Sequence, residues 1–391
     1  MSAKKILLLV LLISLSYVGC KNTDSDNNKH NEQSNALKKT WYKRYTGTVN
    51  GQAVVVNIQC SGKNIQGTYY YIDKGIIINL VPSGSSSQNI SDIAFTESNP
   101  AERAKDDDST GKDGWQLHIQ DGTAKGKWTS GDGKSASDID LKEDYPTGAY
   151  PLDILVKGDS KEVRKGVVHV TAASFYELVQ PAAQMNKEQA DFLRVSILHF
   201  LGGEFANVNN ITDYVLQEDK RYFDNFEKLL ADMKIDREAH EDWEYNFEHT
   251  RHLKVLYNNN GMLVLQLGES DRTGGGVMGS HFRSRYACID LEQKKLWQLK
   301  DIMDVDGTKL SPLLNEEARR TFGITKGALT EKLRVTDIPL SDNIYTTGMG
   351  ITFCYYPGVI APEDDGEICL FIPYVKLKNW LKPDFKRRMP L

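Results

Sequence analysis

The chain has 391 residues, of which 26% are charged and 40% are apolar, so its ordinary globular composition excludes wholesale disorder and a collagen-like fold. The formal net charge of −5 argues against a broad basic face for nucleic acid. The only long apolar run stands at the N-terminus, which excludes a protein with several membrane spans.

The first 19 residues have the composition of a secretory signal. Lys4 and Lys5 precede an unbroken run of Ile, Leu and Val over residues 6–13, and smaller residues follow up to Cys20. A charged start, a short apolar stretch and a small-residue end are typical of such signals. The apolar run is shorter than the about 20 residues that a membrane span needs. We therefore expect residues 1–19 to be removed on export; the alternative is an anchor that stays attached.

The end of this segment, Val18-Gly19-Cys20, resembles the lipobox of bacterial lipoproteins, with Tyr17 where that pattern usually has Leu. The resemblance implies cleavage before Cys20 and a lipid on its sulfur that anchors the protein in a membrane. Residues 21–35 contain no apolar residue and cannot bury enough surface to fold. We expect a lipidated flexible tether over residues 20–40 and a place in the bacterial cell envelope, outside the cytoplasm. An outer membrane is expected, and the periplasmic or cell-surface face stays open.

Short strands separated by turn residues indicate a β-rich domain over residues 41–143. The expected strands cover residues 53–58, 67–71, 76–80, 115–119 and 126–129, and clusters of Gly, Asn, Asp and Ser lie between them. This spacing is typical of an all-β meander or a small barrel. Pro146, Gly148 and Pro151 then mark a linker over residues 144–160.

Residues 161–391 mix helical and strand patterns. Apolar residues at helical spacing predict helices over residues 187–201, 212–234 and 310–322, and residues 373–381 are expected to form a final helical turn or two. Strands are expected over residues 163–170, 242–257, 262–267 and 281–291, with a pair at 351–355 and 367–372 closing the sheet. The order predicts an α+β domain with a mainly antiparallel sheet.

Two cysteines are predicted to face each other in that last strand pair. Apolar and other residues alternate along both strands. If the strands pair antiparallel with their apolar faces together, Phe353 faces Leu370 and Cys354 faces Cys369. A cross-strand disulfide between Cys354 and Cys369 is then geometrically allowed, although such bonds are often strained. The alternative is a pair of buried free thiols.

Motifs for catalysis, cofactors and metals are absent from the sequence. The Gly133-Lys134-Ser135 segment fails as a phosphate loop because Trp128 occupies the position of the required first glycine. No HExxH or GxSxG pattern occurs. We expect His249 and His252 to be surface histidines that point to opposite faces of a strand. These observations predict no enzyme, no cofactor and no metal.

A glycine-rich stretch over residues 272–279 precedes a strand that carries Arg and Tyr residues. Arg and Tyr are favoured at interaction surfaces because they combine a large contact area with hydrogen bonding. The sequence therefore predicts a candidate ligand surface, with a structural turn and a solvated basic strand as the alternative. Its members are Arg272, His281, Arg283, Arg285, Tyr286 and Tyr356.

Short motifs in the same region carry a resemblance to a known domain. In chain order they are Thr273-Gly-Gly, Cys288-Ile-Asp-Leu, Leu299-Lys-Asp-Ile, Asn343-Ile-Tyr, Gly350-Ile-Thr-Phe, Tyr355-Tyr-Pro, Ile360-Ala-Pro and Ile372-Pro-Tyr. The set resembles the C-terminal domain of RsiV-type anti-sigma factors, which also accompanies the deacetylase module of PdaC-type peptidoglycan deacetylases. The resemblance covers residues 272–381 and extends back to about residue 163.

This resemblance implies an extracytoplasmic α+β domain, which binds lysozyme in the anti-sigma factors. The deacetylase module is missing, and the usual histidine after the glycine pair is replaced here, so no catalytic role transfers. We expect a non-enzymatic lipoprotein that binds a lysozyme-like protein or a peptidoglycan or other glycan ligand, and no nucleic acid. The alternatives are an envelope hydrolase or deacetylase with an unrecognised site, and a structural envelope component.

Overall fold

The computed structural model describes residues 40–389, except for 63, 84–90, 101–110, 167, 205–206, 234–243, 273–279 and 305–306. The predicted signal, the tether and Cys20 therefore lie outside the described residues. Among the described helices, none is both long and apolar enough to span a membrane.

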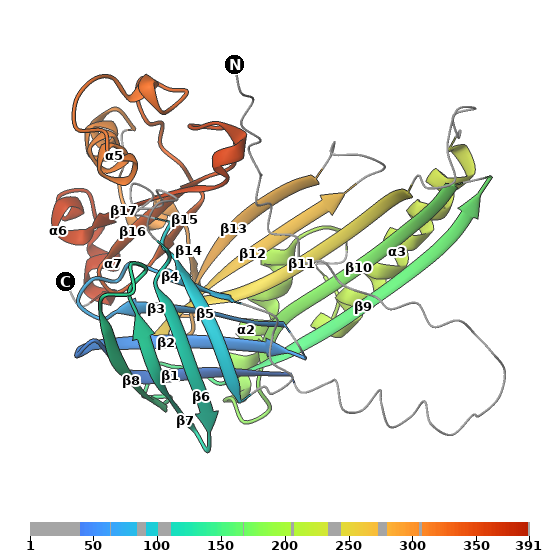
Figure 1. The fold of residues 1–391 in the computed structure, drawn as a ribbon, viewed down its shortest axis with the longest axis horizontal. Helices are drawn as coiled ribbons and strands as arrows, with labels where there is room; N and C mark the ends of the chain where they lie inside the picture. The colour runs from blue at the N-terminus through green and yellow to red at the C-terminus, as the bar shows by residue number, and fades with distance from the viewer. Residues whose placement is uncertain are drawn as a thin grey trace. The chain divides into compact units, whose positions relative to one another are not determined.

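The N-terminal part is a closed barrel of eight strands in which each strand pairs antiparallel with its neighbours in the chain (Figure 1). β1 pairs with β8 through Tyr45 and Glu143, which closes the sheet and leaves no edge. The strands are β1 (Thr40–Val49), β2 (Gln52–Ser61), β3 (Asn64–Tyr71), β4 (Ile78–Pro82), β5 (Asp92–Ser98), β6 (Gly114–Gln120), β7 (Thr123–Thr129) and β8 (Ala136–Glu143).

Alternating side chains fill the barrel and explain its strands. Tyr45, Ile58, Tyr69 and Trp115 are all fully buried in one core. The β1–β2 hairpin turns at Asn50 and Gly51, both with positive φ, which suits the right-handed twist of the strands. A barrel was one of the two predicted forms. The sequence analysis did not predict β1, β5 and β8. In these strands the polar residues at alternate positions face outward.

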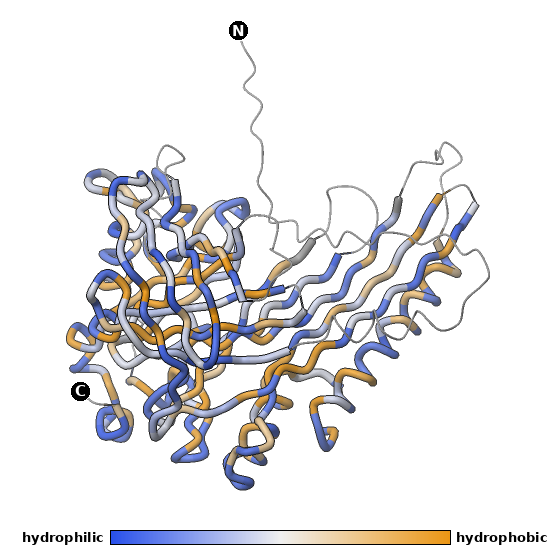
Figure 2. Tube along the Cα trace, turned by 60° about the horizontal axis from the view of Figure 1, so that its bottom comes forward, coloured by the Kyte–Doolittle hydropathy of each residue, from blue (hydrophilic) through white to orange (hydrophobic). Residues whose placement is uncertain are grey.

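The second part is built on a six-stranded sheet in the order β14-β13-β12-β11-β10-β9. All neighbours are antiparallel except β10 and β11, which run parallel because the chain crosses over through two helices between them. Hydrophobic and hydrophilic residues both occur along these long strands (Figure 2), and Met262, Leu263, Val264 and Leu265 are all fully buried. The strands are β9 (Leu152–Lys165), β10 (Val168–Pro181), β11 (Glu244–Asn259), β12 (Met262–Arg272), β13 (Ser280–Asp290) and β14 (Lys295–Trp297).

Two predicted details of this sheet are corrected. The expected strand over residues 163–170 is wrong, because Gly166 at φ 64° turns the chain between β9 and β10. β9 begins at Leu152, so residues 152–160 of the expected linker are part of the sheet. The turn residues Pro146, Gly148 and Pro151 suggested a linker, but all three precede β9. The actual turn between β9 and β10, at Gly166, lies between strand-forming residues and was therefore not predicted.

Helices α2 (Lys187–Leu201) and α3 (Ile211–Asp232) cover one face of the six-stranded sheet (Figure 1). Asn186 caps the start of α2 by accepting from the backbone N–H groups of Glu188 and Gln189. Leu193 and Ile197 of α2 share one buried core with Leu253 of β11. The helical spacing of apolar residues predicted both helices to within two residues at each end.

The C-terminal region packs against the opposite face of the sheet. Its short elements are α4 (Leu299–Ile302), α5 (Gly307–Phe322), η2 (Leu329–Glu331), β15 (Ile344–Thr346), β16 (Gly350–Tyr355), η3 (Glu363–Asp365), β17 (Ile368–Pro373), α6 (Tyr374–Leu377) and α7 (Pro383–Arg388). β15, β16 and β17 form a separate three-stranded sheet. The expectation that the last strand pair closes the main sheet is therefore wrong. The fold is α+β, mostly sheet, with few helices.

Candidate functional site

The predicted ligand surface is divided between the two faces of β13. Its glycine-rich segment, residues 273–279, lies outside the described residues, and of His281 only the backbone in β13 is described. Because side chains alternate along a strand, Arg283 and Arg285 face the helices while Tyr286 faces the three-stranded sheet. The strand thus does not bring these residues to one surface.

Arg285 is held in contacts within the fold. Its Nε donates to Glu269 Oε2 at 3.0 Å, and its Nη1 and Nη2 donate to the carbonyl oxygens of Phe200 and Leu201 at 2.9 and 3.2 Å. A cation near the C-terminus of a helix interacts favourably with the exposed carbonyls and the helix dipole. Arg285 therefore closes the C-terminus of α2 against the sheet.

The other members divide between internal contacts and the surface. The Tyr286 hydroxyl donates to Glu367 Oε2 at 2.7 Å. Arg272 pairs with Glu248 at 3.7 Å. Tyr356 is half-buried, and Arg283 is exposed. Of the six predicted residues, Arg283 is thus the one whose described side chain is most open to solvent.

The backbone of β13 offers a further feature, which we call the β13 edge and define as Phe282, Arg283 and Ser284. The Asn259–Met262 hairpin fixes the hydrogen-bond alternation, so the N–H and C=O groups of Phe282 and Ser284 point away from β12. β14 covers only the stretch from Cys288 to Asp290. Asn343 Nδ2 donates to Ser284 O at 2.9 Å. Phe282 has no backbone hydrogen bond on this side from any described residue, and its ring is 51% exposed.

A buried charged cluster on the helix face was not predicted. His249, only 6% exposed, has its Nδ1 2.7 Å from Asp271 Oδ1 and stacks on Tyr222. The expectation that His249 is a surface residue is therefore wrong, although His249 and His252 do point to opposite faces. Burial disfavours the charged form of Asp271, but its hydrogen bond to His249 and the charge of Arg251 outweigh burial and lower the pKa of Asp271. The cluster lies beneath α3, where His249 is buried and the side chain of Asp271 is 47% exposed.

A second polar cluster joins the barrel to the sheet. Glu177 is fully buried, and its carboxylate accepts hydrogen bonds from Ser61, Asn64 and Gln66 of the barrel at 2.5–3.0 Å. Lys254 Nζ donates to Asn79 of the barrel at 3.2 Å. The barrel is thus attached through side chains that also satisfy buried charges of the sheet.

Three potential metal ligands lie close together on β16 and β17 and at the residue that precedes β17. The sulfur atoms of Cys354 and Cys369 and a carboxylate oxygen of Glu367 lie within 4.8 Å of one another. The predicted register is confirmed, since Cys354 pairs with Cys369 and Phe353 with Leu370. Both cysteines are buried, and no bond joins their sulfur atoms in this structure. Thiolate and carboxylate are ligands that zinc accepts, but three donors leave a tetrahedral structural site one ligand short.

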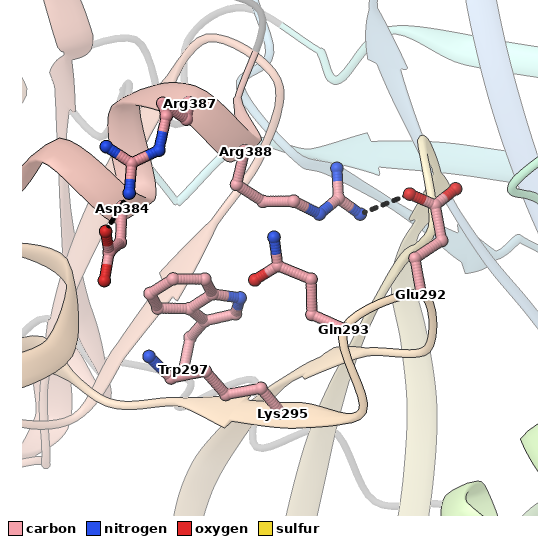
Figure 3. Close-up of a pocket in the computed structure, with 7 residues that line it drawn as sticks. All are labelled: Glu292, Gln293, Lys295, Trp297, Asp384, Arg387 and Arg388. Atoms are coloured by element: carbon pink, nitrogen blue, oxygen red, sulfur yellow. Dashed lines mark hydrogen bonds and ion pairs between the residues drawn. The ribbon is translucent and has the colours of Figure 1, made fainter.

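An open pocket of about 490 Å³ lies beside α7 (Figure 3). Its lining residues are Glu292, Gln293, Lys295, Trp297, Asp384, Arg387 and Arg388. Arg388 pairs with buried Asp290 at 2.6 Å and with Glu292 at 3.6 Å, and Arg387 pairs with Asp384. Arg388 thus holds α7 against the sheet, whereas the Arg387–Asp384 pair lies within α7, and we assign the pocket no ligand.

Part of the C-terminal region matches a known protein family. Residues 300–375 match the family described as "Protein of unknown function (DUF3298)". The C-terminal region carries a DUF3298 domain. None of the curated proteins searched matches the chain. The matched segment runs from α4 into α6 and includes the thiol pair and Tyr356, whereas β13 precedes it.

Two solved DUF3298 proteins resemble the chain. One from Bacteroides fragilis NCTC 9343 is 18% identical, covers 62% of this chain and 98% of its own, and has a TM-score of 0.50. One from Pseudomonas aeruginosa PAO1 is 14% identical, covers 60% of this chain and 96% of its own, and has a TM-score of 0.38. At 18% sequence identity, the similarity to the Bacteroides fragilis protein shows a shared fold and nothing about function. The description of the DUF3298 family states no activity.

Proposed function

We propose that the protein is a lipid-anchored, extracytoplasmic binding protein without catalytic activity, and that it binds a lysozyme-like protein. The lipobox-like Val18-Gly19-Cys20 segment supports the anchor and the location. The motif resemblance to RsiV-type domains supports the ligand class. A peptidoglycan or other glycan ligand is the second candidate, because the PdaC-type enzymes that share the domain act on the cell wall.

The β13 edge is the single structural observation that carries the binding proposal. A protein ligand can add an extended segment to an open sheet edge and gain both backbone hydrogen bonds and side-chain contacts. Phe282 presents its backbone N–H and C=O outward beside its exposed ring, and Arg283 is exposed next to it. Unpaired backbone groups at an open sheet edge promote aggregation unless another chain or segment covers them. A bound ligand segment would cover them at the β13 edge.

The proposal is tested by titrating the full chain, held in detergent micelles, with a basic lysozyme. Because this chain carries a net charge of −5, weak attraction at low salt carries little weight. We expect saturable binding that persists at physiological salt. Sedimentation with purified peptidoglycan is the parallel assay for the second candidate. If neither ligand binds at physiological salt, the proposed function is wrong.

A further inference from the structure

Cys354 and Cys369 occupy a backbone position that brings their sulfur atoms together. The Cys354 N–H donates to Asn343 O at 2.9 Å, and Cys354 O accepts from Ser341 Oγ at 2.7 Å. Both groups therefore point toward β15 and away from β17. Across β16 and β17 the two cysteines are a non-hydrogen-bonded pair, in which Cα atoms lie about 4.5 Å apart. That separation lies within the range found for disulfides, about 4.4–6.8 Å.

The two sulfur atoms already touch. They lie 2.8 Å apart, and the residues are only 1% and 3% exposed. The other described cysteines have different surroundings: Cys60 Sγ lies 3.5 Å from Gly62 O in the barrel, and Cys288 Sγ lies 3.9 Å from Thr346 Oγ1. They provide internal controls for any measurement on the pair.

We propose that Cys354 and Cys369 are joined by a disulfide in the exported protein, formed by exchange with a disulfide-bonded oxidant. This rests on the export that the proposed function includes. One cysteine thiolate attacks the disulfide of the oxidant, forms a mixed disulfide and releases one thiol. The second cysteine then attacks the mixed disulfide and releases the other thiol. The two cysteines lose two protons and two electrons in total, and the oxidant ends as two thiols.

Burial decides when this exchange takes place. Burial is the largest of the effects that raise the pKa of the Cys354 thiol well above its ordinary value, so the attacking thiolate is scarce in the folded protein. The oxidant also has no access to residues that are so little exposed. The bond therefore forms during folding, before β17 is covered, and it is protected from reduction afterwards.

The bond would fix the segment that joins β16 and β17. This segment carries Tyr356 of the predicted surface, and near its end Glu367 accepts the hydrogen bond from Tyr286 on β13. A metal ion is the competing occupant of the same donors. We favour the covalent pair because the group offers only three donors within the described residues, one fewer than a tetrahedral structural zinc site needs.

The test is to trap the thiols of the full chain isolated from the envelope fraction of the producing cells. The chain is denatured without reductant in the presence of an alkylating agent, digested, and analysed by mass spectrometry. We expect a linked Cys354–Cys369 peptide two hydrogen atoms lighter than the sum of its parts, with Cys60 and Cys288 fully alkylated. After reduction, all four should be alkylated.

Two results would overturn the inference. Alkylation of all four cysteines without reductant would show an unpaired dithiol, and alkylation only after a chelator, with one zinc ion per chain, would show a metal site. Lysozyme binding by a chain whose four thiols are all free would leave the proposed function standing and remove only this inference.

A second measurement concerns stability. Closing a loop of about 15 residues restricts the unfolded chain, and we expect reductant during a thermal scan to lower the Tm of the wild type by about 5 °C. The Cys354→Ser/Cys369→Ser double variant should unfold at the same temperature with and without reductant. An equal Tm of the wild type in both conditions would contradict the proposed bond.

Discussion

His249 illustrates how far a single residue can depart from its sequence context. It stands among charged residues, which predicted exposure, yet its place in β11 turns it toward α3 and Tyr222. The register that pairs His249 with Asp271 of β12 is set by the Asn259–Met262 hairpin, nine to ten residues away along the two strands. Alternation along the strand could have shown which residues share a face with His249, but not that a helix covers that face.

The Asp271 carboxylate should stabilise the fold only while it is ionised. Because its pKa is lowered in the folded state, the stabilisation is present above the unfolded value near 4 and is lost as the pH falls through the folded pKa. We expect Asp271→Asn to lower the free energy of unfolding at pH 7 by about 1 kcal/mol, measured by urea unfolding. The difference from wild type should shrink at pH 3, and the exposed control Asp138→Asn should change little at either pH. An Asp271→Asn effect that does not depend on pH would contradict this account.

Lys254 should give a pH dependence of the same sign, but at alkaline pH. Burial lowers its pKa to about 8, although the nearby carboxylates of Glu177 and Glu367 oppose that change. Between pH 8 and 10 the folded protein therefore binds fewer protons at this residue than the unfolded chain, so the stability that Lys254 confers rises with pH. Relative to Lys254→Met, the wild type should gain about 1 to 3 kcal/mol over that range in urea unfolding. Parallel pH profiles of the two proteins would show that Lys254 titrates normally.

At the scale of elements, Arg285 provides a direct test of how α2 is held. Its guanidinium donates to the last carbonyls of α2, whereas Arg283 on the same strand face is exposed. We expect Arg285→Ala to lower the free energy of unfolding by about 2 kcal/mol and Arg283→Ala by less than about 0.5 kcal/mol. Chemical unfolding followed by far-UV circular dichroism compares the two. Equal effects would mean that Arg285 does not close the helix.

Elements with strong local patterns were predictable, and those set by distant partners were not. The apolar spacing of Leu193, Ile197 and Leu201 predicted α2, and alternation predicted that Cys354 faces Cys369. The turn at Gly166 was missed because strand-forming residues flank it on both sides. The small sheet of β15–β17 was assigned to the main sheet because alternation within a strand does not say which sheet the strand joins.

The candidate site was predictable only in part for the same reason. Sequence singled out Arg283 and the strand that holds it, and period-two alternation already separates Arg283 and Arg285 from Tyr286. The open edge beside Phe282 depends on β14 being only three residues long and on where it pairs. Both features depend on which strands pair with each other, and neither composition nor local residue spacing predicts strand pairing.

At the scale of the whole molecule, the described contacts join the barrel and the sheet through buried polar groups. Arg44 of β1 is 1% exposed, and it donates to the carbonyl oxygens of Asn258 and Asp144 at 2.8 and 2.7 Å. Gln59 of β2 both donates to and accepts from the backbone of β11. Removing such a partner leaves buried groups unsatisfied, so the two parts should unfold together.

We expect Arg44→Ala to lower the free energy of unfolding by about 3 kcal/mol while keeping a single transition. The neighbouring Lys43 pairs with Glu143 at 2.8 Å on the partly exposed surface, so Lys43→Ala should cost less than about 1 kcal/mol. Urea unfolding monitored by tryptophan fluorescence and circular dichroism measures both. Two separate transitions in the wild type would contradict the coupling of barrel and sheet.

The most direct test of ligand binding at the β13 edge is a lysozyme titration at physiological salt of three full-length proteins: wild type, Phe282→Pro and Phe282→Ala. Proline removes the outward N–H of Phe282, which the β12–β13 ladder does not use, whereas alanine keeps that N–H and removes only the ring. Strand addition predicts that wild type binds, that alanine weakens binding about tenfold, and that proline weakens it further. Equal binding by all three proteins, with unchanged stability, would contradict the central claim.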